Sequence, residues 1–240
     1  MKTNQILIWP SWTWKSSKWK ELARIQWKNF IDFDNDILEN ISQQTAIDIF
    51  SILDKNSEEK LKFNPYQLIN TSVAHILDLV WSDNFIKIEE YLTLKLDLQN
   101  TVLATSWSQV LSDKAMKHLN NIWDTIYLNE ELGNIMKRTH KMKLNRIVWM
   151  PFDLDYMSQS EIIKKYKEIM LERLNKYVQY SNLIYKNKDF EENRKKSIIK
   201  NKNWIPILEN WNTMVNNKKD IQLNFENFLN FLKDKWIVRI

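Results

Sequence analysis

The sequence predicts an α/β domain in which a five-stranded parallel sheet is covered by helices on both faces. Two observations predict this class. Short apolar stretches typical of buried strands alternate with longer helical patterns along residues 5–185. The first of these strands also leads directly into a helix through a segment that is small and polar except for three tryptophans, which is a common βα arrangement. A length of 240 residues fits one large domain or a domain with insertions.

The expected elements follow one another in βα order. The first strand covers 5–9 because Ile6, Leu7 and Ile8 form an apolar run, and a helix follows over 15–27. A second strand at 30–34 ends in two carboxylates. Apolar residues at helical spacing then predict helices at 37–53 (as one or two segments), at 66–81 after the break at Asn64-Pro65, and at 84–98.

The second half repeats the alternation with clearer boundaries. Strands are expected at 101–105, 125–128 and 183–185, with helices at 112–120, 130–140 and 158–180. Ser158 with Glu161 three residues later is a capping box that begins the long helix. Residues 187–220 are rich in Asn and Lys with weak periodicity and are expected as a loop or insertion, before a last helix at 225–235.

Composition has one anomaly that bears on function. The chain contains 1 glycine and 12 tryptophans, whereas ordinary usage of roughly 7% would give about 17 glycines. Glycine is required where φ is positive or where backbone approaches a ligand. One codon, UGA, is read as tryptophan in some bacterial codes and as glycine in others. We therefore expect that most of these tryptophans are glycines in the natural protein.

The segment 9–17 shows what this substitution implies. It reads Trp-Pro-Ser-Trp-Thr-Trp-Lys-Ser-Ser. With glycine at Trp9, Trp12 and Trp14 it becomes G-P-S-G-T-G-K-S-S, the phosphate-binding loop G-x-x-x-x-G-K-[ST] between a strand and a helix. Lys15 would then contact the β- and γ-phosphates of ATP, and the Ser16 hydroxyl would hold Mg²⁺.

The charge pattern, the hydropathy and the lack of cysteine argue against a nucleic-acid-binding, membrane or disulfide-bonded protein. The net charge is +5, but its lysines are spread among acidic residues without an arginine-rich block, so we expect no nucleic-acid partner. No apolar run approaches the 18 or so residues of a membrane span, so no membrane association is expected. Zero cysteines exclude disulfides and fit a cytoplasmic protein. The three histidines show no metal-binding spacing.

With glycine at the tryptophan positions, five segments in order resemble the shikimate kinase family. The loop at 8–23 is the first, and Phe30-Ile31-Asp32-Phe33-Asp34 resembles the family's F-x-D-x-D. Residues 102–108 lie where the family has a strand and a triple glycine, and the helix after 126–128 carries Arg138. Residues 172–177, Glu-Arg-Leu-Asn-Lys-Tyr, resemble the family's E-R-x-x-x-Y helix.

The resemblance implies a three-layer P-loop kinase fold with a lid, and an enzyme of aromatic amino-acid biosynthesis. It would transfer the γ-phosphoryl group of ATP, with Mg²⁺, to the 3-hydroxyl of shikimate. It implies Lys15, Asp34 and Arg138 as catalytic residues, and Asp34, Trp107 (as glycine) and Arg173 as residues that bind the acceptor. The expected ATP site is Trp12, Thr13, Trp14, Lys15, Ser16, Ser17 and Arg138, and the expected Mg²⁺ ligands are Ser16 and Asp32. Arg146 competes with Arg138 as the lid arginine.

Some positions depart from the family pattern. Its substrate-binding Phe-Arg corresponds to Phe85-Ile86, with Glu89 in register, and Ile86 cannot pair with a carboxylate. The outer glycines around Trp107 are serines. Two alternatives therefore stand beside shikimate kinase: another P-loop kinase, such as a gluconate or nucleoside monophosphate kinase, or a non-catalytic nucleotide-binding module. Asp34 also has an alternative, purely structural role as the N-cap of the following helix.

The expected domain plan is a kinase domain over 1–186, with a lid at about 139–157 and a possible insertion at about 41–83. Residues 187–222 are expected as an insertion or loop, and 223–240 as a C-terminal helix of the same domain. We expect a monomer.

Overall fold

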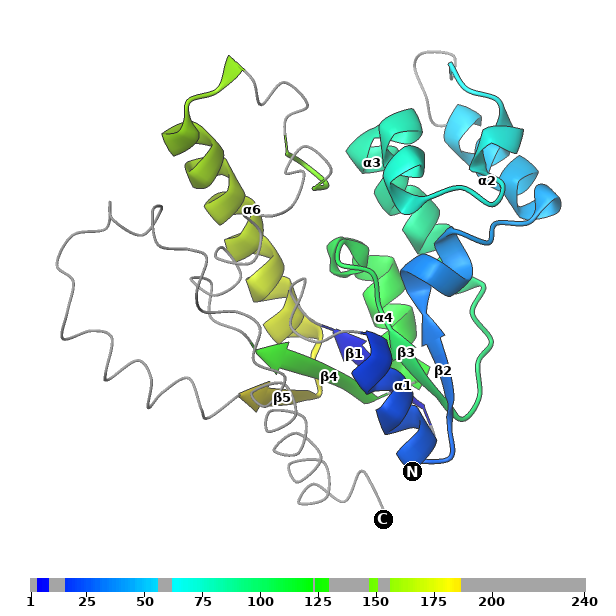
Figure 1. Ribbon diagram of the computed structural model, residues 1–240, viewed down its shortest axis with the longest axis vertical. Helices are drawn as coiled ribbons and strands as arrows, with labels where there is room; N and C mark the ends of the chain where they lie inside the picture. The colour runs from blue at the N-terminus through cyan, green and yellow to red at the C-terminus, as the bar shows by residue number, and fades with distance from the viewer. Residues whose placement is uncertain are drawn as a thin grey trace, which may run out of the picture.

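The computed structural model (Figure 1) describes residues 4–8, 16–55, 62–122, 124–129, 147–150 and 156–186. Five strands of this part form one parallel sheet in the order β2-β3-β1-β4-β5. The strands are β1 (Gln5–Ile8), β2 (Asn29–Asp32), β3 (Thr101–Ala104), β4 (Asp124–Asn129) and β5 (Leu183–Lys186). The predicted α/β class and the five-stranded parallel sheet are confirmed.

Helices and short turns connect these strands. The α-helices are α1 (Ser16–Ile25), α2 (Gln43–Lys55), α3 (Val73–Leu94), α4 (Asp113–Ile122) and α6 (Gln159–Tyr180). The shorter segments are a π-helical turn η1 (Phe33–Leu38) and two 3₁₀ turns, η2 (Pro65–Leu68) and η3 (Gln109–Leu111). The capping box at the start of α6 is confirmed, because Ser158 and Glu161 bond each other's backbone N–H.

Helices cover both faces of the sheet, which gives the three layers. Every residue of β1 is buried, and its side chains alternate between two cores. Leu7 packs with Trp19 and Leu22 of α1 on one face. Ile6 and Ile8 belong to the larger core on the other face, which α3, α4 and α6 help to form. The three inner strands β1, β3 and β4 are buried on both faces, which explains their apolar runs, whereas the edge strand β2 is partly exposed.

The predicted strand at 30–34 is wrong at its end, because β2 stops at Asp32. Asp32 is the N-cap of η1 and accepts a hydrogen bond from the Asn35 N–H at 3.4 Å. Its own N–H donates to the Asp36 carboxylate at 2.8 Å. Asp32 and Asp34 therefore do not share one strand face, and the capping role considered for Asp34 falls to Asp32.

The two helices predicted at 66–81 and 84–98 are also corrected. Pro65 begins a 3₁₀ turn, and α3 then runs as one segment from Val73 to Leu94. Its path breaks at Trp81, where φ is 65° and ψ is 169°. The helical pattern on either side was read correctly, but the boundary is a kink inside α3 at Trp81 rather than a gap between helices.

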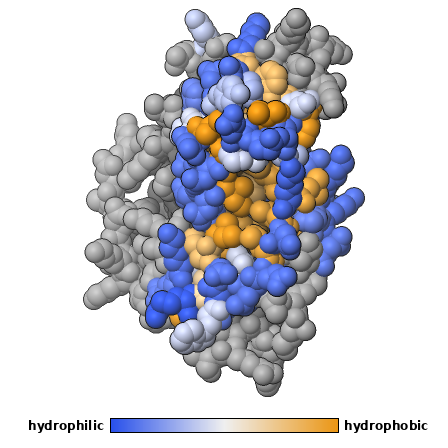
Figure 2. All heavy atoms as spheres, turned by 90° about the vertical axis from the view of Figure 1, so that its right-hand side faces the viewer, coloured by the Kyte–Doolittle hydropathy of each residue, from blue (hydrophilic) through white to orange (hydrophobic). Residues whose placement is uncertain are grey.

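The segment expected as an insertion, 41–83, contributes α2, η2 and the first part of α3. These elements lie together on one side of the molecule in Figure 1. Figure 2 shows this side with hydrophobic residues in a band down the middle and hydrophilic residues along its edges. The helices predicted at 130–140 and 225–235, and the loop at 187–220, lie outside the described residues.

Candidate active site

The expected phosphate-binding loop joins two described elements. Trp9, Trp12, Thr13, Trp14 and Lys15 lie outside the described residues. The elements around them fit the prediction, because β1 ends at Ile8 in the middle of the sheet and α1 begins at Ser16. Ser16 and Ser17 form the first turn of α1. A phosphate group bound by the loop would lie at this helix N-terminus.

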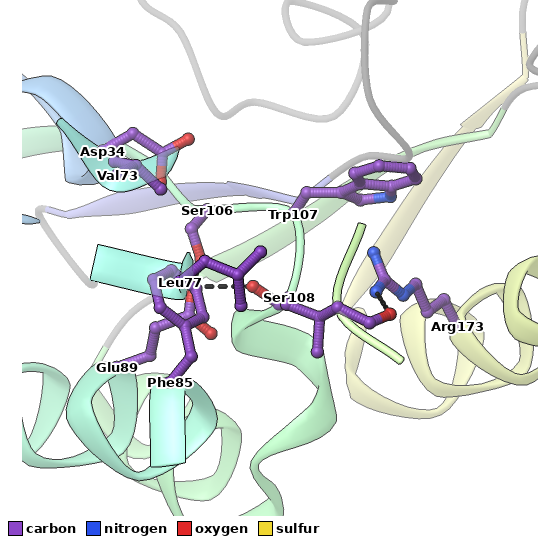
Figure 3. A pocket seen from close by; sticks show the side chains of 10 residues that line it. Asp34, Val73, Leu77, Phe85, Glu89, Ser106, Trp107, Ser108 and Arg173 are labelled. Atoms are coloured by element: carbon purple, nitrogen blue, oxygen red, sulfur yellow. Dashed lines mark hydrogen bonds between the residues drawn. The ribbon is translucent and has the colours of Figure 1, made fainter. Parts of the chain in front are cut away.

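A cavity of about 120 Å³ lies beyond the carboxyl ends of β2 and β3 (Figure 3). Ligands of parallel α/β sheets bind at this edge. The cavity is lined by residues from η1, α3, the segment after β3, the segment at 147–150 and α6: Asp34, Val73, Leu77, Phe85, Glu89, Ser106, Trp107, Ser108, Val148 and Arg173. The predicted acceptor residues Asp34, Trp107 and Arg173 are thus brought together.

Asp34 lies in η1 and is half-buried at the cavity wall. Burial raises the pKa of Asp34 to about 7, and the negative charges of Asp32 and Glu39 add to the shift. A carboxyl group with a pKa near neutrality can accept and release a proton at physiological pH, which suits a general base. Asp32 does not line this cavity.

Arg173 is fully buried on α6. Its position follows from Tyr177, one helical turn later, which stacks on Tyr127 of β4 with ring centroids 5.4 Å apart. The Arg173 Nη2 donates to the Val148 carbonyl at 2.9 Å, and the guanidinium carbon lies 4.5 Å from the Trp107 ring centroid. Its Nε has no partner among the described residues. Burial lowers the pKa of Arg173, so an anion at this site would relieve an incompletely paired buried cation.

Trp107 covers Arg173 on the cavity side. Its main chain is fixed independently of the indole, because the Tyr177 hydroxyl donates to the Trp107 carbonyl at 2.9 Å. The indole Nε1 has no partner among the described residues. A glycine at 107 would keep this backbone anchor and leave the face of Arg173 open to a ligand.

Glu89 is a cavity residue to which the sequence assigned no role. It is fully buried on α3, and its Oε1 accepts hydrogen bonds from the hydroxyls of Ser106 and Ser108, the latter at 2.8 Å. Burial raises the pKa of Glu89 to about 8, and the Asp34 charge adds to this, whereas both serines and Arg173 oppose it. The sequence signal for Glu89 was its position relative to Phe85-Ile86, which matches the family pattern.

Ile86 confirms the departure from the family pattern. It is partly buried and packs against the larger core instead of lining the cavity. Lys87 is exposed and donates to Asn84 at 3.2 Å. Among the described lining residues Arg173 is the one cation. Arg138 and Arg146 lie outside the described residues, and of the expected lid only 147–150 and 156–157 are described.

The fold and the cavity define a class of protein. A parallel sheet of order β2-β3-β1-β4-β5, with a βα junction at the central strand and an acid–arginine cavity beside it, is the architecture of a small-molecule P-loop kinase. The shikimate kinase family model matches residues 66–202, more than half of the 240 residues. The chain belongs to the shikimate kinase family. It is an ATP-dependent kinase that transfers a phosphoryl group to a hydroxyl of a small hydroxylated acid, in aromatic amino-acid biosynthesis.

One solved structure supports this family at the level of the fold. Shikimate kinase from Bacteroides thetaiotaomicron is 12% identical, with a TM-score of 0.54 over 96% of this chain and 98% of that chain. Shikimate kinase from Acinetobacter baumannii in complex with shikimate is 13% identical, with a TM-score of 0.47 over 83% and 94% of the two chains. The enzyme from Aquifex aeolicus is 16% identical, with a TM-score of 0.41 over 82% and 94%. No curated protein matches the sequence.

None of the described helices combines the length and apolar character that crossing a membrane requires. The described part of the chain holds no group of three or more His, Cys, Asp or Glu side chains able to bind a metal ion.

Proposed function

We propose that the acceptor is shikimate and that Asp34 and Arg173 bind it in the cavity beyond β2 and β3. Arg173 would pair with the acceptor carboxylate through its planar guanidinium. Asp34 would accept the proton of the 3-hydroxyl as that oxygen attacks the γ-phosphorus and the bond from phosphorus to the β,γ-bridging oxygen breaks, releasing ADP. The observation that carries the proposal is that one cavity holds both residues.

ATP would bind at the junction of β1 and α1. Lys15 would contact the β- and γ-phosphates, and the backbone of Trp12, Thr13, Trp14, Ser16 and Ser17, with glycine at the tryptophans, would surround them. Arg138 would stabilise charge on the transferring group from the lid. Support comes from the position of the junction at the central strand.

Mg²⁺ fits the donor set at the same junction. Ser16, the first residue of α1, would supply its hydroxyl, and Asp32, the last residue of β2, would supply its carboxylate. Hard oxygen donors with room for water are the usual magnesium environment in kinases. When bound, the ion neutralises charge on the phosphates, and Ser16 and Asp32 would hold it.

We further propose that most tryptophans of the printed sequence stand where the natural protein has glycine. Of the five tryptophans in the described part, Trp27, Trp81 and Trp149 have φ values of 55°, 65° and 72°. Positive φ is glycine's region and is unfavourable for a bulky residue. Trp27 and Trp81 are also 91% and 68% exposed, so burial gives little reason for an indole there. The gene decides the matter: UGG codons at Trp9, Trp12, Trp14 and Trp107 would contradict the proposal.

The remaining assignments complete the proposal. We propose a kinase domain over 1–186 with the lid at about 139–157, an insertion or loop at 187–222, and a C-terminal helix of the same domain at 223–240. The enzyme would work as a cytoplasmic monomer. The absence of cysteine from the sequence is compatible with a reducing compartment.

A coupled assay of ADP release tests the function. The natural chain, with ATP and Mg²⁺, is offered shikimate, gluconate and a nucleoside monophosphate in parallel. Turnover with shikimate alone supports the proposal, whereas turnover with another acceptor and none with shikimate favours a different P-loop kinase. ATP binding without turnover of any acceptor favours a non-catalytic module, for which Ile86 is the supporting observation.

A further inference from the structure

Glu89 leaves one carboxyl oxygen without a partner at the cavity wall. Its Oε1 accepts from both Ser106 and Ser108, whereas Oε2 is buried and has no hydrogen-bond partner among the described residues. The side chain is fully buried and lines the cavity. A buried polar atom without a partner is destabilising, because it has lost its hydrogen bonds to water without replacing them. A ligand in the cavity would remove that penalty.

The two serines fix which oxygen remains available. They lie on either side of Trp107 in the segment after β3, and both hydroxyls point to the same atom of Glu89 (Figure 3). Since Oε1 already accepts two hydrogen bonds, the proton of the neutral acid resides on Oε2. That oxygen is therefore a hydrogen-bond donor to whatever occupies the cavity.

The position of Glu89 indicates which part of the acceptor it meets. Figure 3 shows Asp34 and Glu89 on one side of the cavity and Arg173 on the other. If Arg173 binds the carboxylate of the acceptor, the opposite side receives its hydroxyl groups. A hydroxyl oxygen can accept a hydrogen bond and also donate one, so it satisfies a neutral acid that must donate.

We propose that Glu89 is a specificity-determining residue that binds a hydroxyl group of the acceptor through Oε2, held in place by Ser106 and Ser108. The inference deepens the proposed function and rests on it. It also explains the role of Ser106 and Ser108. Ile86 is apolar and packs in the core, so it cannot form an ion pair with Glu89, and the two serines hold the Glu89 carboxyl group instead.

The charged and titratable groups around Glu89 set the pH dependence. Asp34 faces it from η1, and Arg173 and Tyr177 face it from α6. The segment after β3 contributes only serine hydroxyls as direct partners. With a pKa of about 8, Glu89 is mostly neutral at pH 7 and mostly ionised at pH 9. Binding that needs the neutral acid should weaken about tenfold between these values.

Calorimetric titration of the natural full-length chain with shikimate at pH 7 and pH 9 tests the inference. Wild type should bind about tenfold more weakly at pH 9. Glu89→Gln keeps a neutral donor, so it should bind within about threefold of wild type at pH 7 and lose most of the additional weakening at pH 9. Glu90→Gln is the matched control: Glu90 is the next residue on α3, bonds Ser112 at 2.6 Å outside the cavity, and should behave as wild type.

Two results would overturn the inference: equal pH dependence in wild type and Glu89→Gln, or undiminished binding by Glu89→Ala at pH 7. If the Glu89 variants do not fold, the Ser106→Ala/Ser108→Ala variant provides the test. Both serines lower the pKa of Glu89, so their loss should move the midpoint of the binding profile to higher pH, and an unmoved midpoint contradicts the inference. A wild-type chain that neither binds nor phosphorylates shikimate contradicts the proposed function as well.

Discussion

Position 81 should prefer glycine to alanine, against the usual order within a helix. Trp81 lies inside α3 with φ 65° and ψ 169°, a region that only glycine enters without strain. Alanine is the informative comparison, because it has a Cβ but no indole. The difference between Trp81→Gly and Trp81→Ala therefore reports the backbone alone, whatever the indole contributes.

The size of this difference follows from two opposing terms. A residue with a Cβ is destabilised in this region by about 1–3 kcal/mol. Glycine loses more conformational freedom on folding, which costs about 0.5–1 kcal/mol relative to alanine. The glycine variant should therefore have the higher free energy of unfolding, by roughly 1 kcal/mol. At Trp27 and Trp149, where φ is 55° and 72°, the glycine variant should likewise be more stable than the alanine variant.

Urea unfolding of each Gly/Ala pair, followed by circular dichroism, measures the difference. Leu171 is the matched control, because it is a large apolar side chain on α6, 52% exposed and outside the positive-φ set. Leu171→Gly should be about 1 kcal/mol less stable than Leu171→Ala. If alanine equals or exceeds glycine at position 81 while the Leu171 pair keeps its expected order, the assignment of 81 as a glycine position is refuted.

Three further predictions concern the cavity. Asp34→Asn should lower kcat about 10²–10⁴-fold through loss of the base, with Asp48→Asn on α2, outside the cavity, as a control with unchanged kcat in the coupled assay. Arg173→Lys should raise KM for the acceptor at least about tenfold and leave KM for ATP unchanged, because an ammonium group cannot replace the planar fork; equal KM values would contradict its carboxylate role. The free energy of unfolding should fall as pH rises from about 4.5 to about 8, since folded Glu89 keeps a proton that the unfolded chain releases. That contribution is at most about 1.4 kcal/mol per pH unit and should vanish in Glu89→Gln.

Local patterns predicted the inner strands of the sheet well, because β1, β3 and β4 are buried on both faces and contain apolar runs. The edge strands β2 and β5 are partly exposed, but all five strands were predicted to within a residue or two, and the capping box predicted the start of α6. Boundaries set by single side chains were harder. Asp32 ends β2 by capping η1, and its N–H bonds the Asp36 carboxylate. Hydrogen bonds from single backbone N–H groups to the side chains of nearby acids leave no periodic signal in the sequence.

The cavity was predicted in part for a similar reason. Asp34 and Arg173 were identified by a family pattern, and the structure places them in one cavity. Glu89 was not assigned, because its role depends on Ser106 and Ser108, which lie 17 and 19 residues away in sequence. A contact between an internal helix position and a loop after a strand is made by tertiary packing, which no local pattern contains.

The charge distribution in the cavity bears on the acceptor alternatives. The walls carry one described cation, Arg173, and two carboxyl groups, Asp34 and Glu89. A nucleoside monophosphate brings a phosphate with up to two negative charges, and the ionised form of Asp34 would oppose it where only one arginine can pair with it. A hydroxylated monocarboxylate brings one negative charge for Arg173 and neutral hydroxyls for the two acids. The cavity therefore favours shikimate or gluconate over a nucleotide acceptor, and Arg173→Lys should weaken binding of a monocarboxylate acceptor far more than binding of its uncharged methyl ester.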